Sequence, residues 1–191
     1  LNEKENLFLL LPVISELYPG AHIIISDDGS ADGTAGLIAS FIKEGFGSPL
    51  YFLSRKDNTI CTNVSGFNEA VFSGDALGLR GTKGLTASVL DALYIMTTEK
   101  FAVIDADFQH PPGIILDMHN KLQDADLVCA YRTKLEGFPV YRKCMSRLGN
   151  LLANCSLPGN LKIHDPLSGA FAGNINTLRK HLVNTERFRP E

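Results

Sequence analysis

The 191-residue chain contains no Trp and only four cysteines, and none of its apolar runs approaches the roughly 20 residues that a membrane-spanning helix needs. No two cysteines have Cys-x-x-Cys spacing, which argues against a zinc site and against a disulfide framework. We therefore expect reduced, mostly buried thiols in a cytosolic protein. The polar residues 1–6 do not resemble a signal peptide. Because no initiator Met is present, we expect a fragment or an incompletely ordered chain.

Charge is unevenly distributed along the chain. Charged residues make up 20% of the chain, and the net charge is −3. From Tyr131 onward, 10 basic residues stand against 4 acidic ones, a net of +6, and the remainder has a net of −9. The acidic part before Tyr131 suits a cation site, and the basic part from Tyr131 onward suits an anionic partner. A chance imbalance between solvated surfaces is the alternative.

Apolar runs alternate with amphipathic stretches along the chain. Short apolar runs predict strands at 22–26, where the run is β-branched, and at 50–53, 101–104 and 127–130. Apolar residues at helical spacing predict helices at 34–43, 84–97, 111–122 and 141–155. Asp32 is a candidate N-cap for the first helix, and Pro111-Pro112 suits the start of the third.

This alternation predicts one α/β domain that contains a mostly parallel sheet with helices on both faces. Residues 55–83 are rich in Gly, Asn and Ser and are long for a connection, so they fit a lid or an insertion. Two acidic clusters, Asp27-Asp28 and Asp105/Asp107, follow predicted strands directly. Ligands of such sheets bind beyond the carboxyl ends of the strands, so both clusters are candidate site residues.

The second cluster has the composition of a cation site. Asp105, Asp107 and Gln109 offer two carboxylates and an amide oxygen at alternate positions, and hard cations such as Mg²⁺ prefer oxygen ligands. A carboxylate-held cation can neutralise a diphosphate leaving group. In the first cluster, Asp27 or Asp28 is a better candidate for accepting hydrogen bonds from a nucleotide base or ribose than for binding a cation. The alternatives are solvated turn carboxylates at the second cluster and a turn with a helix cap at the first.

Five motifs carry a family resemblance, and they are Asn2-Glu3-x-x-Asn6-Leu7, Asp27-Asp28-Gly29-Ser30-x-Asp32-Gly33-Thr34, Lys83-Gly84-Leu85, Asp105-Ala106-Asp107-Phe108-Gln109-His110-Pro111-Pro112 and Asp165-Pro166-Leu167-Ser168-Gly169. They are similar to motifs of family 2 glycosyltransferases, and their order resembles the dolichyl-phosphate mannose synthase branch. The resemblance covers nearly the whole chain apart from residues 55–82.

The resemblance implies a single GT-A (Rossmann-like) catalytic domain over residues 1–191. It implies Mg²⁺ or Mn²⁺ held by Asp105, Asp107 and Gln109. It places the nucleotide-sugar near Glu3, Asp27, Asp28, Lys83 and Asp105. It assigns the lipid phosphate and the transferred sugar to Arg132, Arg142 and Ser146. The catalytic residues that it implies are Asp107, Arg132 and Arg142.

The implied activity is transfer of a single sugar, with mannose from GDP-mannose favoured, to a polyprenyl or dolichyl phosphate with inversion. Such an enzyme is expected at the cytosolic face of a membrane as a peripheral protein, without a nucleic-acid partner. Two departures from the family pattern stand out. The Pro-Thr-Tyr string ahead of Asn2 is missing, and with it the first strand, so the N-terminal strand is expected to be truncated. Ala130-Tyr131 stands where the family has Gly-Ser.

Several other functions remain open. A UDP-glucose-dependent lipid-phosphate glucosyltransferase and other family 2 glycosyltransferases share these motifs. Processive polysaccharide synthases resemble one another in a Gln-x-x-Arg-Trp string, and the absence of Trp from this chain disfavours them. A nucleotide-binding regulator without turnover is the alternative from outside the enzymes.

Overall fold

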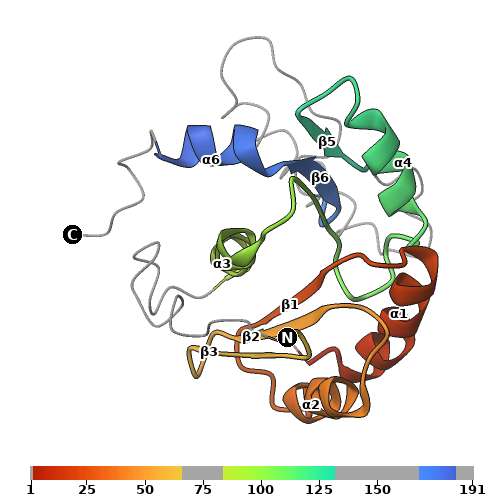
Figure 1. Cartoon of the computed structure of the whole chain (residues 1–191), viewed down its shortest axis with the longest axis vertical. Helices are drawn as coiled ribbons and strands as arrows, with labels where there is room; N and C mark the ends of the chain where they lie inside the picture. Colours follow the sequence, from red (N-terminus) through yellow and green to blue (C-terminus); the bar gives the residue numbers. More distant parts are fainter. Residues whose placement is uncertain (1, 66–83, 132–167, 184–191) are drawn as a thin grey trace, which may run out of the picture.

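The computed structural model describes residues 2–65, 84–131 and 168–183. In these ranges the chain is an α/β protein whose strands form two three-stranded sheets (Figure 1). The α/β fold class is therefore confirmed. No helix in these ranges is both long and apolar enough to span a bilayer.

The first sheet has the order β1-β2-β3 and consists of β1 (Ile23–Asp27), β2 (Leu50–Ser54) and β3 (Thr59–Thr62). β1 and β2 are parallel, whereas β3 pairs with β2 in the antiparallel direction. Residues 59–62 thus belong to the sheet and not to a lid or an insertion. Cys61 on β3 is exposed because alternate side chains of this edge strand face outward, so the expectation of a buried thiol is wrong at this position.

The second sheet has the order β4-β6-β5 and consists of β4 (Lys100–Val103), β6 (Phe171–Asn174) and β5 (Leu127–Cys129). β6 lies in the middle and is antiparallel to both neighbours. Among the pairings in the described ranges, only β1–β2 is parallel, so the sheets are mixed rather than mostly parallel. The reason is that β3 and β6 are short return strands, which strand–helix alternation does not reveal.

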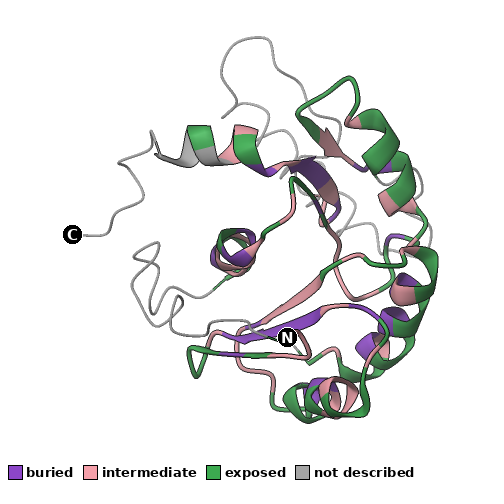
Figure 2. Cartoon of the chain, viewed as in Figure 1, coloured by how far each residue is buried: buried purple, intermediate pink, exposed green. Residues whose placement is uncertain are grey.

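The helices of the described ranges are α1 (Lys4–Leu17), α2 (Thr34–Glu44), α3 (Leu85–Ile95), α4 (Ile114–Lys121) and α6 (Ile175–Val183). They cover both faces of the first sheet, as expected. Leu50 and Phe52 of β2 pack against α1 and α2, while Tyr51 and Leu53 face Ile95 of α3. Figure 2 shows this buried strand between α3 and the α1–α2 pair. Burial on both faces explains why β2 is apolar at successive positions.

The second sheet is also covered on both faces. Met118 of α4 packs against Ala172 of β6 on one face. Leu93 of α3 packs with Phe101 and Ile175 on the other. Helix α3 therefore contacts both sheets. The Tyr18 hydroxyl at the end of α1 donates to the Pro112 carbonyl at 2.9 Å, and this hydrogen bond connects α1 to the segment before α4.

Helix α2 begins at Thr34 as predicted, but its predicted N-cap is wrong, and so is the predicted start of α4. Gly33, with a φ of 89°, occupies the N-cap position of α2 instead of Asp32. Helix α4 begins at Ile114 rather than at Pro111, because the Ile114 N–H first closes a turn onto the Pro111 carbonyl at 3.0 Å. The predicted helix 141–155 lies outside the described residues.

Candidate functional site

The loop that follows β1 is organised by the carboxylate of Asp27. One oxygen accepts the N–H groups of Gly29 and Ser30 at 3.0 and 2.8 Å, and the other accepts the Ser30 hydroxyl. Asp27 is buried. Since all three donors belong to the loop itself, Asp27 holds the shape of the loop.

The N-terminal motif contacts the same loop. The Asn2 N–H donates to the Ser30 hydroxyl at 2.8 Å, and the Ala31 N–H donates to the Asn2 side-chain oxygen at 3.0 Å. Half-buried Glu3 follows and accepts the Asn6 side-chain amide at 2.6 Å. Two motifs that are more than 20 residues apart in the sequence are thereby joined at the carboxyl end of β1.

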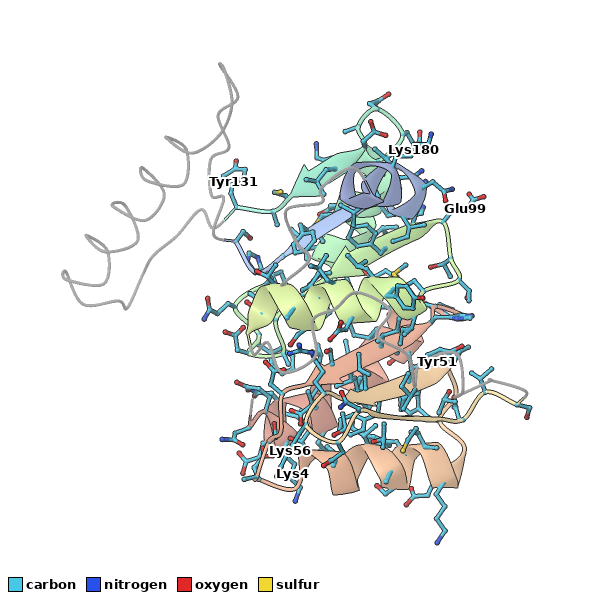
Figure 3. The ribbon with its side chains drawn as sticks, turned by 90° about the vertical axis from the view of Figure 1, so that its left-hand side faces the viewer. Lys4, Tyr51, Lys56, Glu99, Tyr131 and Lys180 are labelled. Atoms are coloured by element: carbon cyan, nitrogen blue, oxygen red, sulfur yellow. The ribbon has the colours of Figure 1, made fainter. Side chains whose placement is uncertain are left out.

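Two lysines flank this loop. The side chains of Lys4 and Lys56 lie next to Gly33 and Gly29 (Figure 3). Gly29 has a φ of 99°, and a Cβ at this position would lie 3.0 Å from the Lys56 side chain. The backbone conformation therefore favours a glycine here, and Lys56 would have to shift slightly to admit a larger residue.

Asp28 is held by a different set of donors from those of Asp27. One of its oxygens pairs with Arg55, and the other accepts the Gly84 N–H at 3.1 Å. Burial by itself would raise the pKa of Asp28, but the Gly84 N–H and the Arg55 guanidinium together hold this pKa below its ordinary value. Asp28 is thus a fixed carboxylate, ionised at neutral pH.

Arg55 is a site residue that the sequence reasoning missed. Its Nε donates to Asp91 of α3 at 2.6 Å, and its Nη1 donates to Ser88 at 3.2 Å in addition to Asp28. A sequence signal existed, because Arg55 and Lys56 directly follow a buried strand next to the strand that Asp28 follows. Parallel neighbours bring their carboxyl ends together, so a cation after β2 could have been matched with the acidic pair after β1.

The second acidic pair follows β4. Asp105 and Asp107 are half-buried, whereas Gln109 is exposed. The Gln109 N–H donates to the Asp107 carboxylate at 3.0 Å, across a turn in which Phe108 has a φ of 58°. This left-handed residue bends the chain sharply, so the three predicted ligands do not follow one extended strand.

The end of the Asp165–Gly169 motif packs directly against this pair. A Cβ at position 169 would collide with the Asp105 carboxylate, so only glycine fits there. Next to it, the Ser168 hydroxyl lies 3.4 Å from Nε2 of buried His110. Two motifs about 60 residues apart in the chain are therefore parts of one structure.

Both acidic pairs line one cavity between the two sheets, with a volume of about 1160 Å³. Its polar lining includes Glu3, Asp27, Asp28, Asp105 and Asp107. Gln109 does not line it. The other predicted site residues, Lys83, Arg132, Arg142 and Ser146, lie outside the described residues.

The donor set suits a cation that is shared with a ligand. Where the structure describes the chain, no three His, Cys, Asp or Glu side chains gather into a metal cage. Mg²⁺ commonly takes only one or two protein carboxylates and completes its shell with waters and substrate phosphates. Asp105 and Asp107 both face the cavity and are oxygen donors, so they fit such a cation.

Comparison with known proteins adds a sequence relative. No protein-family model matches the chain. The chain is 33% identical over 113 residues to a dolichol-phosphate mannosyltransferase of Pyrococcus furiosus, a match that covers 56% of this chain. The chain spans about a third of the length of that relative, since the match covers 31% of it.

A solved structure shares the fold. Glucosyl-3-phosphoglycerate synthase from Mycobacterium tuberculosis, in complex with uridine diphosphate, superposes with a TM-score of 0.59 at 21% sequence identity. The superposition covers 93% of this chain and 55% of the other. The fold predicted from the motifs is thereby confirmed. Together, the sequence match and the shared fold support a family 2 glycosyltransferase of GT-A fold.

Proposed function

We propose that this chain transfers a single sugar, mannose from GDP-mannose, to a polyprenyl or dolichyl phosphate, with inversion and with a divalent cation. The observation that carries the proposal is the meeting of two acidic pairs, one after β1 and one after β4, on one cavity. Such an arrangement offers acceptors to a nucleoside and oxygen ligands to a cation–diphosphate group. The name of the Pyrococcus furiosus relative supports the choice of sugar and acceptor.

On the donor side, the described residues divide the work. Asp28 presents a fixed, ionised carboxylate to N–H or O–H donors of the nucleoside, and Glu3 lies on the same cavity wall. Asp105 and Asp107, with Gln109 beside them, would hold Mg²⁺ or Mn²⁺, which when bound neutralises the diphosphate leaving group. Gly169 leaves room for the Asp105 carboxylate and so sets its direction. Lys83 is proposed to contact the donor as well.

On the acceptor side, the chemistry needs little proton transfer. A phosphate monoester is already anionic at neutral pH, so the nucleophile must be oriented more than deprotonated. Guanidinium groups bind phosphate through two parallel hydrogen bonds, which suits Arg132 and Arg142 for this task, with Ser146 near the transferred sugar. In-line attack by the phosphate oxygen would break the bond between the anomeric carbon and the diphosphate and invert that carbon.

A lipid acceptor requires contact with a membrane. The residues from Tyr131 onward have a net charge of +6. Basic residues near an anionic surface contribute on the order of 1 kcal/mol each. We therefore propose peripheral binding at the cytosolic face, with these basic C-terminal residues toward the headgroups.

UDP-glucose is the second candidate donor, because the solved structure that shares the fold is a complex with uridine diphosphate. One experiment separates the candidates. GDP-mannose and UDP-glucose are each incubated with the chain, Mn²⁺ and a short polyprenyl phosphate, and the glycolipid product is measured. We expect product from GDP-mannose. Product from UDP-glucose and none from GDP-mannose would show that the donor is UDP-glucose. Nucleotide binding without product and without breakdown of the donor would favour a nucleotide-binding regulator.

A further inference from the structure

Arg55 is the most deeply placed cation near the cavity in the described ranges, and it joins three separate segments. It follows β2, its guanidinium reaches Asp28 after β1, and it also reaches Asp91 on α3. The Arg55 side chain is 7% exposed, and that of Asp28 is 13% exposed. A charge this far from water needs its partners, so the three groups depend on one another.

The geometry of this cluster requires a guanidinium. The Arg55 Nε donates to Asp91, and its Nη1 donates to Asp28 and Ser88. One planar guanidinium therefore donates to three acceptors in different directions. A Lys ammonium has one nitrogen on a flexible stem and cannot reproduce this fork. Two carboxylates against one guanidinium leave the cluster with a net charge of −1, which faces the cavity through Asp28.

The same cluster fixes the start of α3. Asp28 accepts the Gly84 N–H with the oxygen that does not face Arg55, and Ser88 and Asp91 lie in the first two turns of the helix. The carboxylate and the helix start are therefore held in one position relative to each other. Helix α3 in turn packs on both sheets through Ile95 and Leu93, so the buried core holds the helix start and the carboxylate in place.

We propose that Arg55 is a positioning residue for nucleotide binding, which acts by fixing the carboxylate of Asp28 between β2 and the start of α3. The ligand is a nucleoside diphosphate whose base or ribose donates to Asp28. This inference rests on the proposed function, because it takes the cavity to be the donor site. Asp91 takes part only indirectly, by holding the far side of the guanidinium.

The test compares Arg55→Lys, Asp28→Asn and the double variant for binding of GDP and of UDP, each with Mn²⁺, by calorimetry. Arg55→Lys keeps the charge and loses the fork. We expect each single variant to weaken binding by about tenfold, and the double variant to bind no more weakly than Asp28→Asn, since coupled residues are not additive. Lys43→Met, which removes an exposed cation at the end of α2, is the control and should bind like the unmodified chain.

Asp91→Asn provides a second route in case Arg55→Lys folds poorly. It leaves the guanidinium in place and removes only its second anchor, so nucleotide binding should weaken by a few fold. Equal binding by Arg55→Lys and the unmodified chain, or additive losses in the double variant, would overturn the positioning role alone. If the unmodified chain binds neither nucleotide, the proposed function falls and the positioning role falls with it.

Discussion

Neighbouring carboxylates in one motif have different tasks because their surroundings differ. Asp27 accepts donors from its own loop, whereas Asp28 accepts donors from β2 and from the start of α3. The sequence treats the two alike, since both follow the same apolar strand. Only the structure shows that Asp28 is the member of the pair that connects the loop to the rest of the cavity wall.

Gly169 is the position at which a small change should have a large effect. An added methyl group collides with the Asp105 carboxylate, so Gly169→Ala must push that carboxylate away from its present direction. A misplacement of about 1 Å near the chemistry can cost about 100-fold in rate. We expect a loss of this order in sugar transfer, measured at saturating donor.

Gly113→Ala is the matched control for this change. No atom lies within 4 Å of a Cβ at position 113, and its φ of −59° suits any residue. This variant should transfer sugar at the rate of the unmodified chain. Full activity in Gly169→Ala would show that the direction of Asp105 does not matter.

At the scale of elements, one exposed carboxylate connects two helix starts. One oxygen of Asp32 accepts the Lys4 N–H of α1 at 2.9 Å, and the other accepts the Thr34 N–H of α2 at 3.0 Å. The Thr34 hydroxyl and these N–H groups hold the pKa of Asp32 below its ordinary value, against a smaller opposing effect of burial. Asp32 therefore joins the two helices that cover one face of the first sheet.

Replacement of Asp32 should destabilise both helix starts together. Asp32→Ala leaves both N–H groups without this acceptor, so the thermal midpoint should fall. Asp32→Asn keeps one acceptor oxygen, so its thermal midpoint should lie between those of Asp32→Ala and the unmodified chain. Thermal unfolding followed by circular dichroism measures this order, and an unchanged midpoint in Asp32→Ala would contradict the bridging role.

Elements with a clear apolar pattern could be predicted from the sequence, and others could not. β1, β2, β4 and β5 are short apolar runs, and α2 and α3 have helical spacing. Helix α1 was not predictable in this way, because five successive apolar residues at 7–11 hide the period and Pro12 lies inside the helix. β6 has the sequence Phe-Ala-Gly-Asn, which contains two weak strand formers.

The candidate site was predictable where one motif carries it. The half-buried Asp105 and Asp107 lie after β4, as their spacing predicts. The contacts between motifs were not predictable, because a single sequence does not show which loops meet. The contact of Gly169 with Asp105 depends on the pairing of β4 with β6, whose antiparallel direction was not predicted. The contact of Arg55 with Asp28 depends on the β1–β2 pairing, which is parallel as predicted, so only this contact could have been inferred.

At the scale of the whole molecule, the two sheets have unpaired edges that line the same cavity. Among the strands described, β1 pairs only with β2 and β4 only with β6. The Asp27 carbonyl accepts the N–H of Arg55, which follows β2, so it points toward β2. The Glu99 carbonyl accepts the N–H of Ile175, which follows β6, so it points toward β6. Ladder hydrogen bonds alternate, so the N–H groups of Ser26 and Ala102 point away from those partners. An added strand could therefore pair with both edges at this place.

Addition of a five-residue apolar, β-branched segment ahead of Leu1 tests this expectation. Amide exchange of Ser26 and Ala102 should slow by about tenfold or more, because closed ladders exchange only through cooperative opening. The same segment with a central proline is the control, since proline donates no ladder hydrogen bond. Equal exchange with both segments, or protection already present without either, would contradict a strand at this place.

The central claim is that Asp105 and Asp107, the acidic pair after β4, hold the cation needed for sugar transfer. The most direct test is the Mn²⁺ dependence of sugar transfer in Asp107→Ala. Mannose transfer from GDP-mannose to a short polyprenyl phosphate is measured over a series of Mn²⁺ concentrations, with the exposed Asp124→Ala as the control. Because even residues behind metal ligands cost 10- to 100-fold, Asp107→Ala should lose at least roughly 100-fold while its thermal midpoint is unchanged. Activity near that of the unmodified chain at low Mn²⁺ would contradict the claim.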